Sequence, residues 1–163
     1  MYPRWRTRCC MLAQLNLNDY FIDEFAFVAN REHEAAGASS GTLSVDFDIK
    51  RSGETPLDFM ITLVVDVNPH DEEFERGDYR IHLKLSGFFS FAEGVNEEMI
   101  NAMIAHNGLS ILYGVARGSV ADATATSWHG KFVLPAVNFI ELIKQKAEAA
   151  QKGQKVVRKG RKK

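Results

Sequence analysis

Apolar and polar residues alternate with a period of two in four segments, and this pattern constrains the fold most. The four segments are residues 15–28, 43–49, 57–67 and 79–86. Because successive side chains of a strand point to opposite faces, each segment is predicted to be a half-buried antiparallel strand. The first segment alternates less regularly, and the irregularity between Asp19 and Ile22 predicts a β-bulge. Turn-forming residues separate the segments, so the sequence predicts a four-stranded meander.

After the fourth strand the apolar residues recur with a helical period. Asn96 is a helix cap followed by two glutamates, the charge favoured in a first turn, and Asn107-Gly108 is expected to end that helix. A second helix is predicted over about residues 109–126. Its Gly114 and Gly118 lie on one face and predict close backbone packing there.

Asn138 is expected to cap a last helix that stops at Gly153. Strands followed by helices predict an α+β domain, a four-stranded antiparallel sheet with C-terminal helices on one face. We divide the chain into a basic, disordered N-terminal extension (1–13), one domain (14–152) and a basic, disordered tail (153–163).

Charge is distributed unevenly along the 163 residues, although the formal net charge is only −1. Residues 141–163 hold nine basic and two acidic side chains, a net +7, and residues 1–10 add +3. Residues 11–140 hold eight basic and nineteen acidic side chains, a net −11. A basic tail can bind nucleic acid, anionic lipid or an acidic protein surface, but it is more often a solvated end.

The expected compartment follows from the hydropathy and the cysteines. The apolar stretches are far shorter than the ~20 residues of a membrane helix, and no secretory signal is evident, so no membrane span is expected. The two cysteines, Cys9 and Cys10, are adjacent and cannot staple the fold. This indicates a reducing, cytoplasmic location.

No pattern supports catalysis, so the chain is not expected to be an enzyme or to carry a cofactor or a metal. The five histidines have no metal-ligand spacing, and residues 70–73 are expected to be a solvated hairpin tip. Nucleotide-binding glycine loops and activated-serine motifs are absent from the sequence.

Aromatic residues are the more informative feature. Phe88, Phe89 and Phe91 make both faces of the fourth strand apolar at its end. Trp128 and Phe132 add apolar bulk in a segment predicted to be a loop. Such residues either fill a core or an oligomer interface, or they line a groove for a peptide or a pocket for a small ligand.

Three short motifs in order resemble the export chaperone family SecB. They are SGFFSF at residues 86–91, ILYGVAR at 111–117 and LPAVNF at 134–139. The family shows a Gly-x-Phe-Ser strand end, a Leu-(Phe/Tyr)-Pro-Tyr-Ala-Arg helix start and a Pro-Val-Asn-Phe entry to its last helix. The resemblance covers about residues 14–150 and includes the predicted order of strands and helices.

The resemblance implies an ATP-independent holdase that binds unfolded polypeptides or preproteins along apolar grooves, assembled as a homotetramer, a dimer of dimers. Burial of the client's apolar side chains would supply the binding energy. The residues expected to contact the client are Phe88, Phe89, Phe91, Leu112, Tyr113, Trp128, Phe132, Leu134 and Phe139.

The sequence also departs from the export members of the family. The family's Pro-Tyr pair is Gly114-Val115 here, and the tail is basic rather than acidic. The resemblance implies docking of the SecA motor through Glu24, but Val28 and other departures on that face weigh against it. We favour a role in export, with a dedicated client such as a toxin–antitoxin antitoxin as the alternative. A nucleic-acid or small-ligand protein on this fold is the second alternative.

Overall fold

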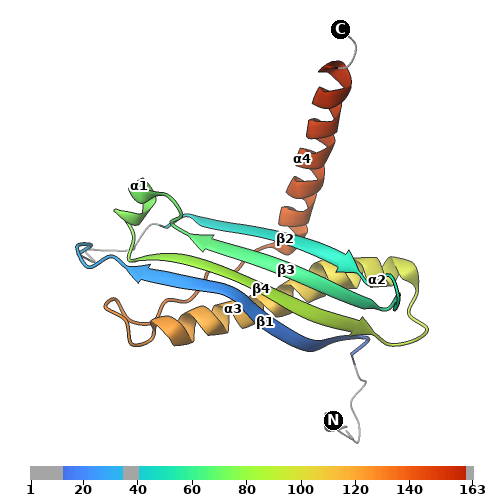
Figure 1. The fold of residues 1–163 in the computed structure, drawn as a ribbon, viewed down its shortest axis with the longest axis horizontal. Helices are drawn as coiled ribbons and strands as arrows, with labels where there is room; N and C mark the ends of the chain where they lie inside the picture. The colour runs from blue at the N-terminus through green and yellow to red at the C-terminus, as the bar shows by residue number, and fades with distance from the viewer. Residues whose placement is uncertain (1–12, 35–40, 161–163) are drawn as a thin grey trace, which may run out of the picture.

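A single antiparallel sheet forms the body of the protein. The computed structural model describes residues 13–34 and 41–160 (Figure 1). The strands are β1 (Leu15–Ala29), β2 (Leu43–Arg51), β3 (Asp58–Val67) and β4 (Tyr79–Phe91). They lie side by side in the order β1-β4-β3-β2. The predicted α+β class and the four antiparallel strands are confirmed.

The order corrects one feature of the predicted sheet. β2, β3 and β4 form a meander, but β1 pairs with β4 instead of β2. The connection over residues 30–42 is long enough to cross the end of the sheet. β4 thereby gains a partner on both sides, which suits a strand along which buried residues alternate with more accessible ones.

The irregularity of the first strand corresponds to two bulges. The pairing of β1 with β4 shifts between Leu17 and Asp19 and again between Ile22 and Glu24. Each shift leaves one extra residue on β1 and turns the strand locally. A β-bulge in this strand is therefore confirmed, but the strand has two bulges where one was predicted.

The helices are largely as predicted, but the boundary between the first two predicted helices differs. They are α1 (Asp71–Phe74), α2 (Glu97–Met103), the π-helical turn η1 (Ile104–Gly108), α3 (Leu109–Thr124) and α4 (Phe139–Gly160). Asn96 caps α2, as expected, through a 2.7 Å hydrogen bond from the Met99 amide. Gly108 does not end a helix, because η1 joins α2 to α3 without a break. A Cβ at Gly108 would lie 2.8 Å from Ile61 Cδ1, so glycine lets this turn approach β3.

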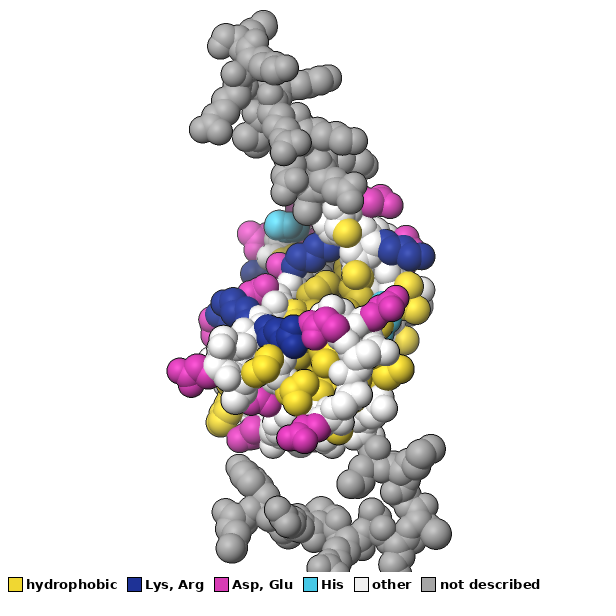
Figure 2. Space-filling model, turned by 90° about the vertical axis from the view of Figure 1, so that its right-hand side faces the viewer, with side chains coloured by type: hydrophobic (Ala, Val, Ile, Leu, Met, Phe, Trp, Pro, Cys, Tyr) yellow, Lys and Arg dark blue, Asp and Glu magenta, His cyan; other side chains and the backbone are white. Residues whose placement is uncertain are grey.

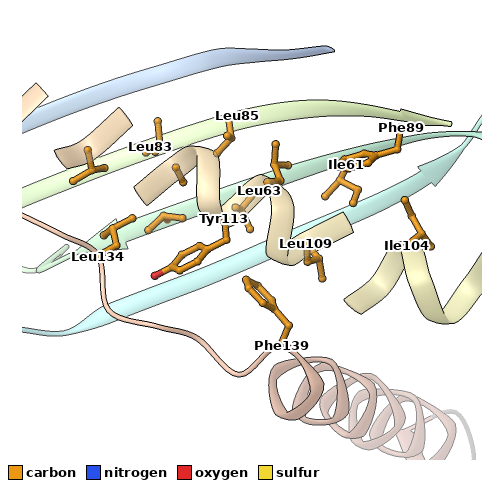
Figure 3. Packing of buried hydrophobic residues seen from close by; sticks show 14 of the residues in the cluster. Ile61, Leu63, Leu83, Leu85, Phe89, Ile104, Leu109, Tyr113, Leu134 and Phe139 are labelled. Atoms are coloured by element: carbon orange, nitrogen blue, oxygen red, sulfur yellow. The ribbon is translucent and has the colours of Figure 1, made fainter. Parts of the chain in front are cut away.

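One face of the sheet carries the hydrophobic core (Figure 3). Side chains of β3 and β4, such as Ile61, Leu63, Leu83 and Leu85, are fully buried beneath α3. The segment between α3 and α4 closes this layer, with Leu134 inserted between helix and sheet. The opposite face carries no helix within the described residues (Figure 1).

α4 leaves the body beside β2 and projects away from the sheet (Figure 1). Asn138 accepts a 3.3 Å hydrogen bond from the Glu141 amide, which confirms the predicted cap. The predicted stop at Gly153 is wrong, since α4 continues to Gly160. Neighbouring Ala, Lys, Gln and Arg favour a helix and outweigh a cost of about 1 kcal/mol for one glycine.

The structure describes only part of the two segments, 1–13 and 153–163, that we expected to be disordered. Residues 153–160 of the tail, which we expected to be disordered, are helical. Residues 1–12, which make up most of the basic N-terminal extension, and residues 161–163 lie outside the described residues. Within the described part of the chain, no helix has both the length and the apolar character required for a membrane span.

Candidate functional site

The nine residues predicted to contact a client do not line one common groove. Most of them pack in the core between the helices and the sheet, four of these being visible in Figure 3. The core residues are Phe89, Phe91, Leu112, Tyr113, Leu134 and Phe139. Phe88 lies on the opposite, open face, where its ring stacks edge-on against Phe21 at 5.9 Å. Of the nine residues, only Trp128 and Phe132 are accessible on the side of the sheet that carries the helices.

Phe132 borders an apolar hollow of about 240 Å³ between the segment 125–138, hereafter the loop, and the sheet. Leu43 and Val67 line it from the β2 and β3 ends, and Tyr79 from the start of β4. Val133 and Pro135 complete the loop wall. This mainly apolar lining, open at one side, suits an apolar side chain of a polypeptide.

The loop is held in place by hydrogen bonds to its backbone. Thr124 Oγ1 accepts one from the Phe132 amide at 2.9 Å, and Tyr79 donates one to the Gly130 carbonyl at 2.6 Å. Arg117 Nε donates to the Leu134 carbonyl at 2.9 Å, and the Tyr113 hydroxyl donates to the Pro135 carbonyl at 2.7 Å. The loop wall of the hollow is therefore formed before any ligand arrives.

A buried asparagine forms the polar end of the same hollow. Asn68 Oδ1 accepts from the Thr42 amide at 2.9 Å, and its Nδ2 donates to the Tyr79 carbonyl at 2.8 Å. Its φ of 49° is left-handed, a conformation that asparagine tolerates well. Sequence reasoning did not single out Asn68, although the Asn68-Pro69 pair is a turn signal.

A second hollow, of about 440 Å³, lies around Phe88 near the β2–β3 turn. Its lining mixes apolar Met60 and Phe88 with charged Lys50 and Asp58. Figure 2 views the end of the molecule that carries this turn and shows apolar side chains gathered among acidic and basic ones. Accessible apolar surface is therefore present at more than one place on the protein.

The open face of the sheet carries paired charges. Glu24 Oε1 lies 3.2 Å from Lys84 Nζ, and Glu24 Oε2 lies 3.4 Å from His82 Nε2. The hydrogen bond from Lys84 lowers the pKa of the Glu24 carboxyl. His82 Nδ1 also lies 2.7 Å from Asp66, and that hydrogen bond raises the pKa of His82. Glu24, the predicted partner-binding residue, is thus already engaged by two side chains.

The histidines do not form a metal centre in the described part of the chain. No group of three or more His, Cys, Asp or Glu side chains there is arranged to hold a metal ion. His70, in the predicted hairpin tip, precedes the single-turn helix α1, and its backbone amide donates to Glu73 at 3.1 Å.

The sequence model of the family described as preprotein translocase subunit SecB matches residues 11–150. The chain belongs to the SecB family. Among solved structures, it is similar to the SecB-like chaperone Rv1957 of Mycobacterium tuberculosis, in complex with a ChAD peptide from the HigA1 antitoxin Rv1956. That similarity has a TM-score of 0.55 at 15% identity and covers 77% of this chain and 91% of the other.

A protein of unknown function from Streptococcus agalactiae is also similar, with a TM-score of 0.42 and 10% identity over 75% of this chain and 97% of that one. No curated protein matches the sequence. The likeness to Rv1957 shows the fold, and the family match supports a chaperone function. SecB proteins are chaperones and not enzymes.

Proposed function

We propose that this SecB protein is an ATP-independent holdase that binds unfolded polypeptides. One observation carries the proposal: the preformed apolar hollow between the loop, the start of β2 and the end of β3. Trp128, with 69% of its surface exposed, lies on the same loop and adds accessible apolar area. A folded protein hides its apolar side chains, so a site of this kind selects non-native chains.

The proposal is tested by placing a charge in the hollow. Phe132→Asp is expected to reduce binding of an unfolded polypeptide at least tenfold, because an apolar client would then bury a carboxylate. The matched control is Ile140→Asp on α4, since Ile140 is also a large apolar residue, is exposed and does not line the hollow. Circular dichroism and thermal unfolding confirm that both variants fold. Equal affinities for the two variants would contradict the placement of the site.

Within the holdase function, we place the protein in support of export. The description of the matching family, a preprotein translocase subunit, supports this role. If the SecA motor docks on the open face through Glu24, it must displace Lys84 and His82 from that carboxylate. Glu24→Gln should then weaken SecA binding and leave client binding unchanged, as measured by two separate titrations.

A dedicated client, such as an antitoxin, is the second candidate. The structure of Rv1957 with an antitoxin peptide supports it at the level of the shared fold. Two results together would favour this candidate over export: no binding of SecA, and capture of a single polypeptide encoded beside the chaperone.

We also propose a homotetramer, a dimer of dimers. β1 pairs on one side only, with β4, within the described residues, and Tyr20 and Ile22 are exposed along it. A Cβ at Gly114 or Gly118 would meet no described atom within 4 Å, so the close packing predicted for them does not occur within the described chain. The outer edge of β1 and the glycine face of α3 both suit contact with further copies of the chain. Light scattering tests the assembly, and Gly118→Leu is expected to weaken it.

A further inference from the structure

The first two turns of α4 fix this helix to the body of the protein. Phe139 is buried, and its ring lies edge-on at 5.5 Å from the Tyr113 ring. Lys146 Nζ lies 2.6 Å from Asp46 Oδ1 and 4.4 Å from the centre of the Phe47 ring. Lys146 also donates a hydrogen bond to the Phe47 carbonyl. These contacts with β2 set the direction of α4 and its rotation about its own axis.

Beyond Lys146 the helix continues to Gly160 and projects away from the sheet (Figure 1). At 1.5 Å per residue, Lys159 lies about 20 Å further along the helix axis than Lys146. Charges in solvent are largely screened beyond a Debye length, which is about 8 Å at physiological salt. The net charge of −11 on residues 11–140 therefore does not neutralise the cations of the outer part of α4.

The outer part of α4, residues 149–160, holds four basic residues and no acidic one. Three of them are spaced i, i+3 and i+7 and so share one face of the helix. At 3.6 residues per turn, these three positions lie about 120–180° around the helix axis from Lys146, on the side away from β2. They are Lys152, Lys155 and Lys159, hereafter the lysine stripe.

The rest of the outer helix indicates which polyanion the lysine stripe suits. A helix that lies on an anionic membrane also inserts large apolar side chains, such as Trp, Phe or Leu. The positions opposite the stripe are Ala150, Gly153 and Val157, which offer little apolar area. Binding to a nucleic acid needs no such insertion, because lysines that neutralise phosphates and release counterions supply the affinity.

We propose that the lysine stripe of α4 binds the phosphate backbone of RNA, as a second binding surface distinct from the hollow. The choice of RNA over DNA rests on the proposed holdase function, because unfolded chains emerge from ribosomes, whose surface is rich in RNA. The loop that borders the hollow leads directly into α4. A stripe bound to ribosomal RNA would therefore hold the hollow close to emerging chains.

The proposal is tested with the full chain and fluorescein-labelled oligouridine, followed by fluorescence anisotropy. Each phosphate contact contributes about −0.7 to the slope of log K against log salt for a single strand. Replacing all three lysines of the stripe by glutamine should make this slope shallower by about 2 and weaken binding at least tenfold at about 50 mM salt. Glutamine has nearly the helix propensity of lysine, so α4 is retained, as circular dichroism checks.

A matched control removes the same charge from the acidic body. It carries glutamine at three exposed basic positions remote from α4, namely Lys50, Arg76 and Lys131. This control should bind oligouridine nearly as well as the parent chain. Equal losses in the two triple variants would show a response to net charge alone and would overturn the stripe as a site.

Co-sedimentation with ribosomes tests the choice of RNA. The parent chain and the control variant should sediment with ribosomes at low salt, and the stripe variant should not. Tighter binding of duplex DNA than of oligouridine would overturn the assignment to RNA. Binding to vesicles of phosphatidylcholine and phosphatidylglycerol without binding to oligouridine would overturn the assignment to nucleic acid.

A titration with an unfolded polypeptide separates this proposal from the holdase function. The stripe variant should bind the polypeptide as the parent chain does, because the stripe does not line the hollow. If RNA binding depends on the stripe and no polypeptide binds, the RNA site stands and the holdase function fails. If polypeptide binds and no protein binds RNA at low salt, the RNA site fails and the holdase function stands.

Discussion

Leu134 anchors the loop, and its truncation gives the sharpest test of how the site is built. The side chain is fully buried, so Leu134→Ala removes three carbons from the core. At about 0.8 kcal/mol per carbon, the lost transfer free energy is about 2.4 kcal/mol. Arg117 and Tyr113 hold the Leu134 and Pro135 carbonyls, so the loop cannot easily collapse into the cavity, and the cavity adds roughly 1–2 kcal/mol.

The expected loss in the free energy of unfolding is therefore about 3.5–4.5 kcal/mol, or a fall in Tm of about 10 °C for a chain of this size. Phe132→Ala, two residues away and partly exposed, is the matched comparison. It should cost much less stability and lose far more client affinity. Thermal and urea unfolding at one fixed protein concentration measure the stability. A cost below about 1 kcal/mol for Leu134→Ala would refute its assignment to the core and return it to the client surface.

Three further perturbations test other parts of the account. Gly108→Ala should lower the free energy of unfolding by up to about 2 kcal/mol, since the clash with Ile61 outweighs the gain in helix propensity; a more stable protein in urea unfolding would contradict the close contact. Tyr113→Phe should cost about 1 kcal/mol through loss of the hydrogen bond to the loop, and an unchanged Tm would show that this bond contributes nothing. The raised pKa of His82 adds stability that is complete below its unfolded pKa and is lost as pH rises through the folded value. The difference in Tm between the parent and His82→Gln should therefore shrink from about pH 6 to about pH 8, and a constant difference would contradict the ion pairs.

Alternation was a reliable guide to the strands because β3 and β4 bury one face and the inward side chains of β2 are partly buried. The burial pattern of β3 repeats the sequence pattern residue by residue. The position of β1 could not be predicted in this way, because strand order depends on which edges meet across long connections and not on the pattern within a strand. Gly108 misled the helix prediction for a related reason, since its role is close contact with Ile61, a residue nearly fifty positions away.

The candidate site was the least predictable part. Sequence reasoning identified the loop and two of its accessible residues, Trp128 and Phe132, but it grouped them with core residues such as Leu134 and Phe139. Apolar residues in a loop have the same sequence signature whether they face inward or outward, so burial is a tertiary property. Asn68 was missed because an isolated polar residue acquires a role only when distant segments bring partners to it.

The central claim is that the protein binds non-native chains, and one titration tests it most directly. A model polypeptide is added to the full-length protein either permanently unfolded or native, at moderate salt and without nucleotide, and binding is followed by fluorescence. The account predicts sub-micromolar affinity for the unfolded form alone, a binding free energy more favourable than about −8 kcal/mol. No binding, or equal binding of the native form, would contradict it.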